Sequence, residues 1–201
     1  MAAKLLPKGL LNFVGFGETD SRTLVKKLSG FDSWRFQQRV LRDVSRVDTS
    51  SSMLGSNISF PVCVAPFGLQ KMPSQRGEID SAKAAENAGT GFAMSFWSSC
   101  TIEEVAKAVP NVLRWFQLYI TKDRLVSKNL VQRAKRNGYS AIIVTVDYVV
   151  QGKEYVNLYN DIAASPSLAT KSIEENFYKV FFEGMDVYDL SMEPIDNLEG
   201  Y

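Results

Sequence analysis

The sequence predicts an α/β fold built on a parallel sheet, and three observations lead to this prediction. Short apolar runs recur from residue 62 onward, and segments with helical patterns fill the gaps between them. Runs that are apolar throughout are typical of parallel strands covered on both faces. Each strand with its helix approaches the ~30 residues of a βαβ unit. The predicted strands are 62–65 (VCVA), 92–95 (FAMS), 114–119 (RWFQLY) and 141–147 (AIIVTVD).

Three segments between these strands carry the signals of helices. The first, 78–89 (EIDSAKAAENAG), finishes at Gly89, and glycine favours helix C-termini. The second, 101–109 (TIEEVAKAV), opens on Thr101 with a glutamate three residues later, which is a capping box. The third, 123–138 (DRLVSKNLVQRAKRNG), repeats apolar residues at i, i+4 and closes on basic residues and glycine.

The residues before the first strand follow a different pattern. A short helix is predicted over 20–31 (DSRTLVKKLSGF). The segments 36–41 (FQQRVL) and 53–62 (MLGSNISFPV) predict short strands or a hairpin, with the turn at Gly55-Ser56-Asn57. Beyond residue 155 no fifth strand is evident, although 172–184 (SIEENFYKVFFEG) has helical spacing.

The composition narrows the classes of function. The chain is 45% hydrophobic and 22% charged, with a formal net charge of +1, so charge gives no case for binding nucleic acid or a membrane. The charge is unevenly distributed. Residues 1–153 carry 21 Lys/Arg and 12 Asp/Glu, whereas residues 154–201 carry 2 and 10. This change indicates a separate acidic tail over residues 156–201.

Two residue types that often carry chemistry are scarce. Histidine is absent, which removes the commonest general base and the commonest neutral metal ligand. Cys63 and Cys100 form no CxxC motif, so we expect neither a zinc site nor a disulfide framework. We also expect no signal peptide and no membrane span.

Polar side chains gather where the predicted strands end. A lone polar residue there usually bonds a loop or caps a helix, but all four strands share the pattern, which favours a site. Both barrels and open α/β sheets build active sites at carboxyl strand ends, so an open doubly wound sheet and the first half of a (βα)₈ barrel both remain possible. The strand-end residues are Pro66-Phe67-Gly68, Ser95, Gln117 with Tyr119, and Thr145 with Asp147.

Four stretches carry a family resemblance: 39–72 (RVLRDVSRVDTSSSMLGSNISFPVCVAPFGLQKM), 77–106 (GEIDSAKAAENAGTGFAMSFWSSCTIEEVA), 113–124 (LRWFQLYITKDR) and 141–147 (AIIVTVD). They resemble the FMN-dependent α-hydroxy-acid oxidases and dehydrogenases, the glycolate oxidase group. A weaker match over 6–24 (LPKGLLNFVGFGETDSRTL) extends the resemblance toward the N-terminus. The resemblance spans roughly residues 6–153 and only the first half of the family's proteins. Because that family folds as a TIM barrel, it implies four βα units, a half-barrel, over residues 1–155. We expect the acidic tail over residues 156–201 not to match the family.

The resemblance also implies where a flavin would bind. Ser95, Gln117 and Thr145 match positions that hydrogen-bond the polar edge of the FMN ring. The backbone of Pro66, Phe67 and Gly68 matches a segment that lies against the ring. Uncharged donors and acceptors at these positions would hold a flavin without fixing its redox state.

Substrate contacts follow from the same resemblance. Tyr119 matches a tyrosine whose hydroxyl contacts the substrate near its reacting carbon, and Trp97 matches a tryptophan in the wall of the substrate pocket. The implied reaction oxidises a small 2-hydroxy acid to a 2-oxo acid. The electrons pass to FMN and then to oxygen or another acceptor.

Several matched positions depart from the family pattern. Phe13 stands where the family has a substrate-contacting tyrosine, Phe67 where it usually has threonine, and Phe96 replaces a small polar residue. Glu154 stands where an arginine binds the substrate carboxylate, unless a one-residue shift of register lets Lys153 substitute. A carboxylate ~4 Å from another costs roughly 4 kcal/mol at an effective dielectric near 20, so substrate binding should be weakened.

The family's catalytic histidine, a flavin-facing lysine, a second arginine and the phosphate site belong to the second half-barrel. We therefore expect a truncated, inactive chain. Two alternatives remain: a non-catalytic interaction fragment that self-associates through open sheet edges, and an unrelated small-molecule-binding α/β domain. The expected location is peroxisomal or cytoplasmic, and the chain ends without a Ser-Lys-Leu signal.

Overall fold

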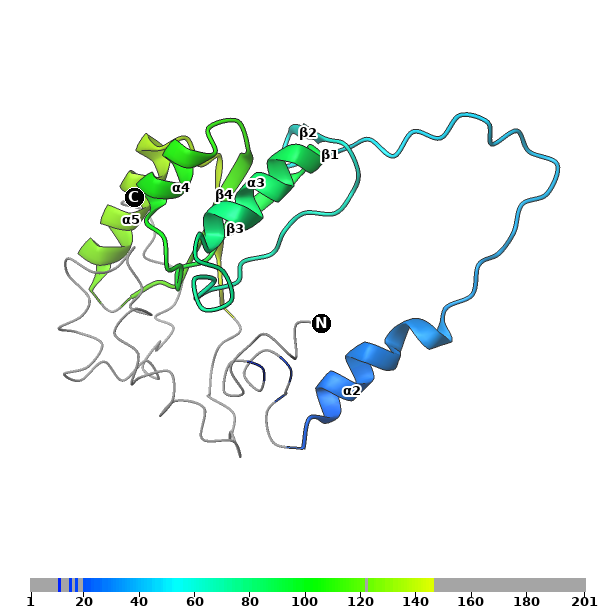
Figure 1. The fold of residues 1–201 in the computed structure, drawn as a ribbon, viewed down its shortest axis with the longest axis horizontal. Coiled ribbons are helices and arrows are strands. Elements are labelled where there is room, and N and C mark those ends of the chain that lie inside the picture. The colour runs from blue at the N-terminus through cyan, green and yellow to red at the C-terminus, as the bar shows by residue number, and fades with distance from the viewer. Residues whose placement is uncertain (1–10, 12–14, 16, 18–19, 122, 147–201) are drawn as a thin grey trace, which may run out of the picture. The chain divides into compact units, whose positions relative to one another are not determined.

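The computed structural model describes residues 11, 15, 17, 20–121 and 123–146. Residues 20–49 and 50–146 belong to two compact units, each taken by itself below (Figure 1). In the first unit, helix α2 (Arg22–Ser29) and the 3₁₀ helix η2 (Gly30–Ser33) confirm the predicted short helix.

The strand predicted over 36–41 does not form. All six of these residues are exposed, and no described residue pairs with them. Leu41 has a φ of 58°, which lies outside the extended region. Apolar residues such as Phe36 and Val40 alternate as in a strand, but a strand needs a neighbour to take its backbone hydrogen bonds.

The second unit opens with the predicted hairpin, in a different register. Strand β1 (Ser51–Met53) pairs antiparallel with β2 (Ser56–Ile58). The turn is Leu54-Gly55 and not Gly55-Ser56-Asn57, because both of its central residues have positive φ, 49° and 78°. Two-residue turns of this kind match the twist of the flanking strands.

A three-stranded parallel sheet forms the centre of this unit. Strands β3 (Gly91–Met94), β4 (Leu113–Leu118) and β5 (Ala141–Val144) lie in that order. The register pairs Met94 with Phe116 and Leu118 with Val144. The parallel sheet, and the strands predicted at these three places, are therefore confirmed.

The first predicted strand, 62–65, forms only a single bridge. Val64 donates from its N–H to the carbonyl of Gly91 (2.8 Å) and accepts from the N–H of Ala93 (2.9 Å), so it lies parallel to the start of β3. The pairing goes no further because the N–H of Val62 turns back to the carbonyl of Phe60 (2.8 Å) and Pro66 has no N–H to donate.

All three predicted helices of this unit are present: α3 (Glu78–Ala88), α4 (Ile102–Ala108) and α5 (Arg124–Arg136). Gly89 ends α3 with a φ of 65°, and Thr101 forms the predicted capping box with Glu104. Asp123 caps α5 through a bond from the N–H of Leu125 to its side chain (2.9 Å). Local sequence signals therefore fixed where each helix begins and ends.

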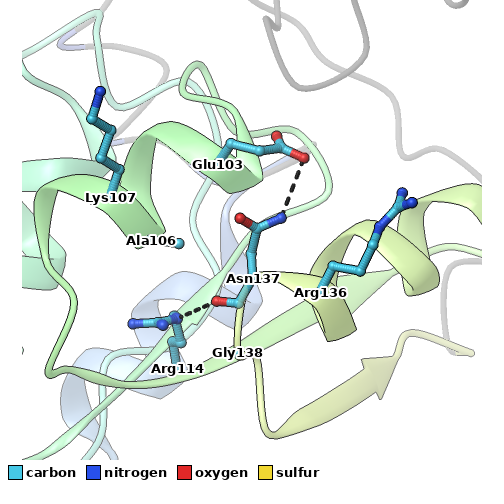
Figure 2. A pocket seen from close by; sticks show the side chains of 7 residues that line it. All are labelled: Glu103, Ala106, Lys107, Arg114, Arg136, Asn137 and Gly138. Atoms are coloured by element: carbon cyan, nitrogen blue, oxygen red, sulfur yellow. Dashed lines mark hydrogen bonds between the residues drawn. The ribbon is translucent and has the colours of Figure 1, made fainter.

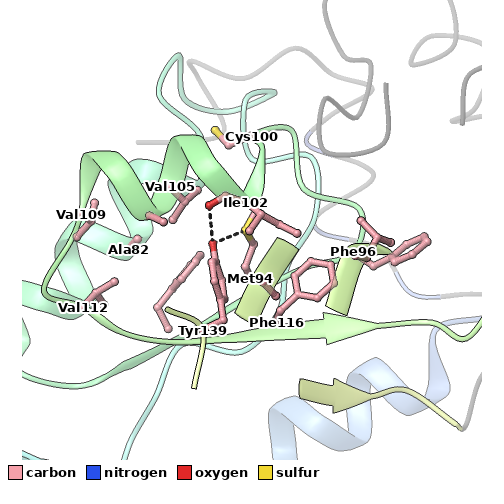
Figure 3. Packing of buried hydrophobic residues seen from close by; sticks show 14 of the residues in the cluster. Ala82, Met94, Phe96, Cys100, Ile102, Val105, Val109, Val112, Phe116 and Tyr139 are labelled. Carbon is pink, nitrogen blue, oxygen red and sulfur yellow. Dashed lines mark hydrogen bonds between the residues drawn. The ribbon is translucent and has the colours of Figure 1, made fainter. Parts of the chain in front are cut away.

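The core lies between the sheet and these helices (Figure 3). Phe92, Met94 and Phe116 are fully buried, and burying such a side chain contributes roughly 1.5–3 kcal/mol. Tyr139 places its hydroxyl in this core, where it donates to the carbonyl of Ile102 (3.2 Å). Because of this burial the pKa of Tyr139 lies above its ordinary value. The packing locks the strands in register and so fixes where their carboxyl ends meet.

Candidate functional site

Three polar side chains meet at the carboxyl ends of the parallel strands. Ser95 follows β3 directly, Gln117 lies near the end of β4, and Thr145 follows β5 directly. Gln117 donates from Nε2 to the hydroxyl of Thr145 (2.9 Å), and its Oε1 lies 3.5 Å from the Ser95 hydroxyl. We call this row the polar string. It joins Ser95 to Gln117, 22 positions apart along the chain, and Gln117 to Thr145, 28 positions apart.

Backbone groups hold the polar string in place. The N–H of Phe96 donates to Oε1 of Gln117 (2.9 Å), and the N–H of Trp97 donates to the Ser95 hydroxyl (3.1 Å). Ser95 and Gln117 are 5% and 4% exposed. Because Oε1 already accepts, the orientation of the Gln117 amide is fixed with its nitrogen toward Thr145.

The chemistry of this donor set suits a flavin ring. The polar edge of an isoalloxazine alternates carbonyl and ring-nitrogen positions, which neutral donors and acceptors can match. Nε2 of Gln117 carries two hydrogens, and its bond to Thr145 uses one of them. Hydroxyls of Ser95 and Thr145 can donate or accept. The residues present therefore fit the polar edge of FMN.

An aromatic cluster stands beside the polar string. The ring of Phe96 meets Trp97 edge to face, with centroids 5.1 Å apart, and Tyr119 in the same way at 5.5 Å. Trp97 and Tyr119, the two predicted substrate-pocket residues, are thus held at 6.4 Å between centroids. Aromatic pairs prefer this edge-to-face geometry, so the contacts with Phe96 set the distance between the rings of Trp97 and Tyr119.

The predicted ring-facing segment lies next to the same cluster. Gly68 packs so closely on Trp97 that a Cβ at position 68 would lie 2.7 Å from the Trp97 Cβ. The N–H of Leu69 donates to the Trp97 carbonyl (3.0 Å). Phe67 is 47% exposed, while its carbonyl accepts from Gln70 Nε2 (2.8 Å). Only glycine fits at 68, so the loop and the aromatic cluster are joined by backbone contact.

Three predicted site residues are not placed. Phe13, Lys153 and Glu154 lie outside the described residues, as does Asp147 at the end of the fourth predicted strand. The predicted substitutions on the carboxylate side of a substrate therefore stay predictions. Sequence reasoning missed the role of the Phe96 N–H, because a backbone donor leaves no signal in the residue type.

A shallow depression lies at the opposite end of the strands (Figure 2). Arg114 is one of its lining residues, but the guanidinium donates hydrogen bonds to the carbonyls of Asn137 (3.0 Å), Val109 (3.1 Å) and Pro110 (2.9 Å). These carbonyls close the ends of α4 and α5, so this arginine serves the fold. The depression is lined by Glu103, Ala106, Lys107, Arg114, Arg136, Asn137 and Gly138.

Other kinds of site find no support in the part of the chain that the structure describes. That part holds no group of three metal-ligating side chains and no helix with the length and apolarity to cross a membrane. Cys63 and Cys100 are free thiols. Burial, followed by the neighbouring Glu78 carboxylate, raises the pKa of Cys100 to about 11, so this thiol stays protonated at neutral pH.

Comparison with known proteins decides the family. A family model described as FMN-dependent dehydrogenase matches residues 2–185. The chain belongs to the FMN-dependent dehydrogenases. The matched span runs beyond residue 155, where we expected the resemblance to end. Whether residues 156–201 form a unit of their own stays a prediction, because the structure describes none of them.

Relatives in this family include 2-hydroxyacid oxidase 1 of Homo sapiens, 40% identical over 173 residues, which cover 86% of this chain and 47% of that protein. Glycolate oxidase 1 of Oryza sativa is 36% identical over 201 residues, covering 100% of this chain and 52% of the relative. The chain thus spans about half the length of the relatives that it matches.

Solved structures agree with the family and with this share. A soluble mutant of the membrane-associated (S)-mandelate dehydrogenase of Pseudomonas putida matches with a TM-score of 0.80 at 32% identity, over 86% of this chain and 49% of that one. A mandelate oxidase with a C4a-OH-FMN adduct matches at 0.78 and 30%, over 85% and 52%. The fold is about half of the TIM barrel of these FMN-dependent enzymes.

Proposed function

We propose that this chain provides the part of an FMN site that binds the polar edge of the flavin ring, in a protein that oxidises 2-hydroxy acids to 2-oxo acids. The polar string of Ser95, Gln117 and Thr145 carries the proposal, because three neighbouring parallel strands bring neutral hydrogen-bonding groups to one edge. The names of the relatives, 2-hydroxyacid oxidase and glycolate oxidase, support the substrate class.

The surrounding residues take roles that fit this proposal. FMN would supply a two-electron acceptor when bound. The backbone of Pro66, Phe67 and Gly68 would lie against the ring. Tyr119 would offer its hydroxyl to the substrate near the reacting carbon, and Trp97 would wall the pocket and keep water out of it.

We further propose that residues 1–201 alone do not turn over substrate. The chain has no histidine, so it lacks the side chain that most readily takes a proton near neutral pH. Glu154 would place a negative charge where a substrate carboxylate needs a positive one. Binding of the ring and turnover are therefore separate questions for this chain.

Two measurements on the purified chain test these proposals. Titration with FMN, followed by quenching of flavin fluorescence, is expected to show saturable binding. Assays with glycolate and with longer 2-hydroxy acids in the presence of FMN are expected to show no turnover. Flavin fluorescence that stays unchanged at high protein concentration would overturn the cofactor proposal. Clear turnover would overturn the proposal of inactivity.

A second candidate function is an interaction fragment that assembles through an open sheet edge. Within the described residues, no strand pairs with β5 on the side away from β4. Val144 is 42% and Val146 58% exposed at that edge, and exposed apolar edge strands template pairing. Size-exclusion chromatography of the chain and of a Val144→Lys variant tests this. A monomer at all concentrations would exclude it, and a dimer lost in the variant would support it.

The location of the protein, peroxisomal or cytoplasmic, stays a proposal of the same kind. Fusion of a fluorescent protein to the N-terminus, which leaves the C-terminus free, tests it by microscopy.

A further inference from the structure

Glu78 is a carboxylate buried in the fold, and the proposed site does not use it. It is the first residue of α3 and is 0% exposed. Its Oε1 accepts from the N–H of Gln70 (3.1 Å) and from the N–H of Ser99 (2.9 Å), and its Oε2 accepts from the Ser99 hydroxyl (2.8 Å). Burying a carboxylate is costly unless it is fully hydrogen-bonded, and hydrogen bonds to a charged group are about twice as strong as neutral ones.

The three donors come from two different loops. Gln70 belongs to the loop after Val64, which carries the ring-facing segment, and Ser99 belongs to the loop after β3, which carries Ser95 and Trp97. The Ser99 hydroxyl also accepts from the N–H of Lys71 (2.9 Å). Glu78 therefore ties the two loops to each other as well as to the start of α3.

Side-chain bonds extend this tie to the ring-facing segment itself. Gln70 donates from Nε2 to the Phe67 carbonyl (2.8 Å), and its Oε1 accepts from the Ser81 hydroxyl (2.6 Å). The backbone of residue 67 is thereby two hydrogen bonds away from the Glu78 carboxylate. A shift of Gln70 would carry the carbonyl of Phe67 with it.

The backbone at Gly77, next to the Glu78 carboxylate, is closely packed against both loops. Gly77 has a φ of 56°, and a Cβ there would lie 2.8 Å from Cγ of Lys71 and 3.3 Å from the Ser99 hydroxyl. This close approach lets α3 begin directly against both loops. Gly68 and Gly77 are therefore the two positions where the first loop packs most closely on the loop after β3.

We propose that Glu78 is a positioning residue, which holds the backbone of residues 66–68 in the place where it meets the flavin ring. This proposal rests on the proposed function, because the ring is the partner of that segment. A residue needed only to fill space could be apolar, whereas Glu78 directs its oxygens at donors from each loop. The carboxylate fixes the distance between the loop that carries Gln70 and the loop that carries Ser99. It thereby fixes the position of the backbone that would lie under the flavin ring.

The test uses Glu78→Gln and Ser99→Ala, with Glu104→Gln as the matched control. Glutamine keeps the shape but turns one acceptor into a donor, and alanine at 99 removes the bridging hydroxyl while keeping Glu78. Glu104 is an exposed carboxylate on the neighbouring helix, and glutamine also completes a capping box there. Ser99→Ala keeps the test decisive if Glu78→Gln does not fold.

Amide hydrogen exchange without FMN is the first readout. In both variants the amides of Leu69, Gln70, Lys71 and Ser99 are expected to exchange about tenfold faster, which corresponds to the loss of roughly one charge-assisted bond. The amides of Val105 and Phe116 in the core should keep their rates, as should all amides in the control. Unchanged rates in the two loops, or equal acceleration in the core, would overturn the proposal.

FMN affinity is the second readout, and it separates the two proposals. Both variants are expected to bind FMN about tenfold more weakly than the wild type, while the control binds as the wild type does. Faster loop exchange with unchanged FMN affinity would overturn the positioning role. If the wild-type chain binds no FMN, the proposed function falls, and the exchange rates alone then decide whether Glu78 ties the loops.

Discussion

The two ends of the parallel sheet carry different kinds of polar groups. At the amino end, the guanidinium of Arg114 donates to three backbone carbonyls. Arg133 there forms a bidentate ion pair with Glu103 (2.9 and 2.7 Å). At the carboxyl end, the polar string is neutral, and Gln117 keeps an N–H beyond the one that Thr145 takes. Charged groups therefore close the fold at one end, and the other end presents the neutral groups of the proposed site.

The largest expected effect at the amino end comes from Arg114→Ala. It leaves three carbonyls at the ends of α4 and α5 without their donor, so the free energy of unfolding should fall by about 3 kcal/mol. Urea denaturation measures the loss. Arg136→Ala, in an exposed residue of the same depression, is the control. FMN affinity in Arg114→Ala should be unchanged at temperatures where the protein is folded, and a loss of affinity there would break the comparison.

Gln117→Leu is the counterpart at the carboxyl end. It removes the acceptor of the Phe96 N–H and the donor to Thr145, which should lower FMN affinity by about 2 kcal/mol, roughly thirtyfold. Fluorescence titration with FMN measures this, and Gln132→Leu on the exposed face of α5 is the control. If both variants bind FMN equally well, the polar string does not contact the ring.

Tyr139→Phe sharpens the comparison in the core. Without the bond to the Ile102 carbonyl, stability should fall by about 1 kcal/mol. The pKa of Tyr139 is raised mainly by burial, so its stabilising contribution is present below its ordinary pKa of 10.0 and is lost as pH rises further. Thermal melts between pH 8 and 11 should therefore show the wild type losing more stability than the variant. Parallel curves would contradict this.

The smallest effect is expected for Glu103→Gln. The hydrogen bond from Arg133 holds the pKa of Glu103 below its ordinary value of 4.5, so the pair stabilises the fold above that value and its contribution is lost as pH falls. Side chains that are 27% and 45% exposed are screened by solvent, so about 0.5 kcal/mol is at stake. In denaturation experiments the wild type should be more stable than the variant by about this amount at pH 7, and this difference should shrink at pH 3. An equal difference at both pH values would assign the loss to packing.

Much of the fold was predictable because its signals are local. Thr101 with Glu104, Gly89 and the basic end of α5 mark helix ends through contacts within a few residues. The strand at 62–65 was overpredicted because its apolar pattern does not reveal that Val62 turns back on Phe60. The hairpin turn was misplaced because the choice between Leu54-Gly55 and the next residues depends on pairing across the hairpin.

The sequence by itself determined the family, the alternation of strands and helices, and the residues that stand at the strand ends. Only the tertiary structure decided that Ser95, Gln117 and Thr145 share hydrogen bonds, and that Glu78 joins two loops. The physical reason is that these bonds depend on the register between strands and on the approach of separate loops. That register and approach are set by packing of the whole core, which no short stretch of sequence specifies.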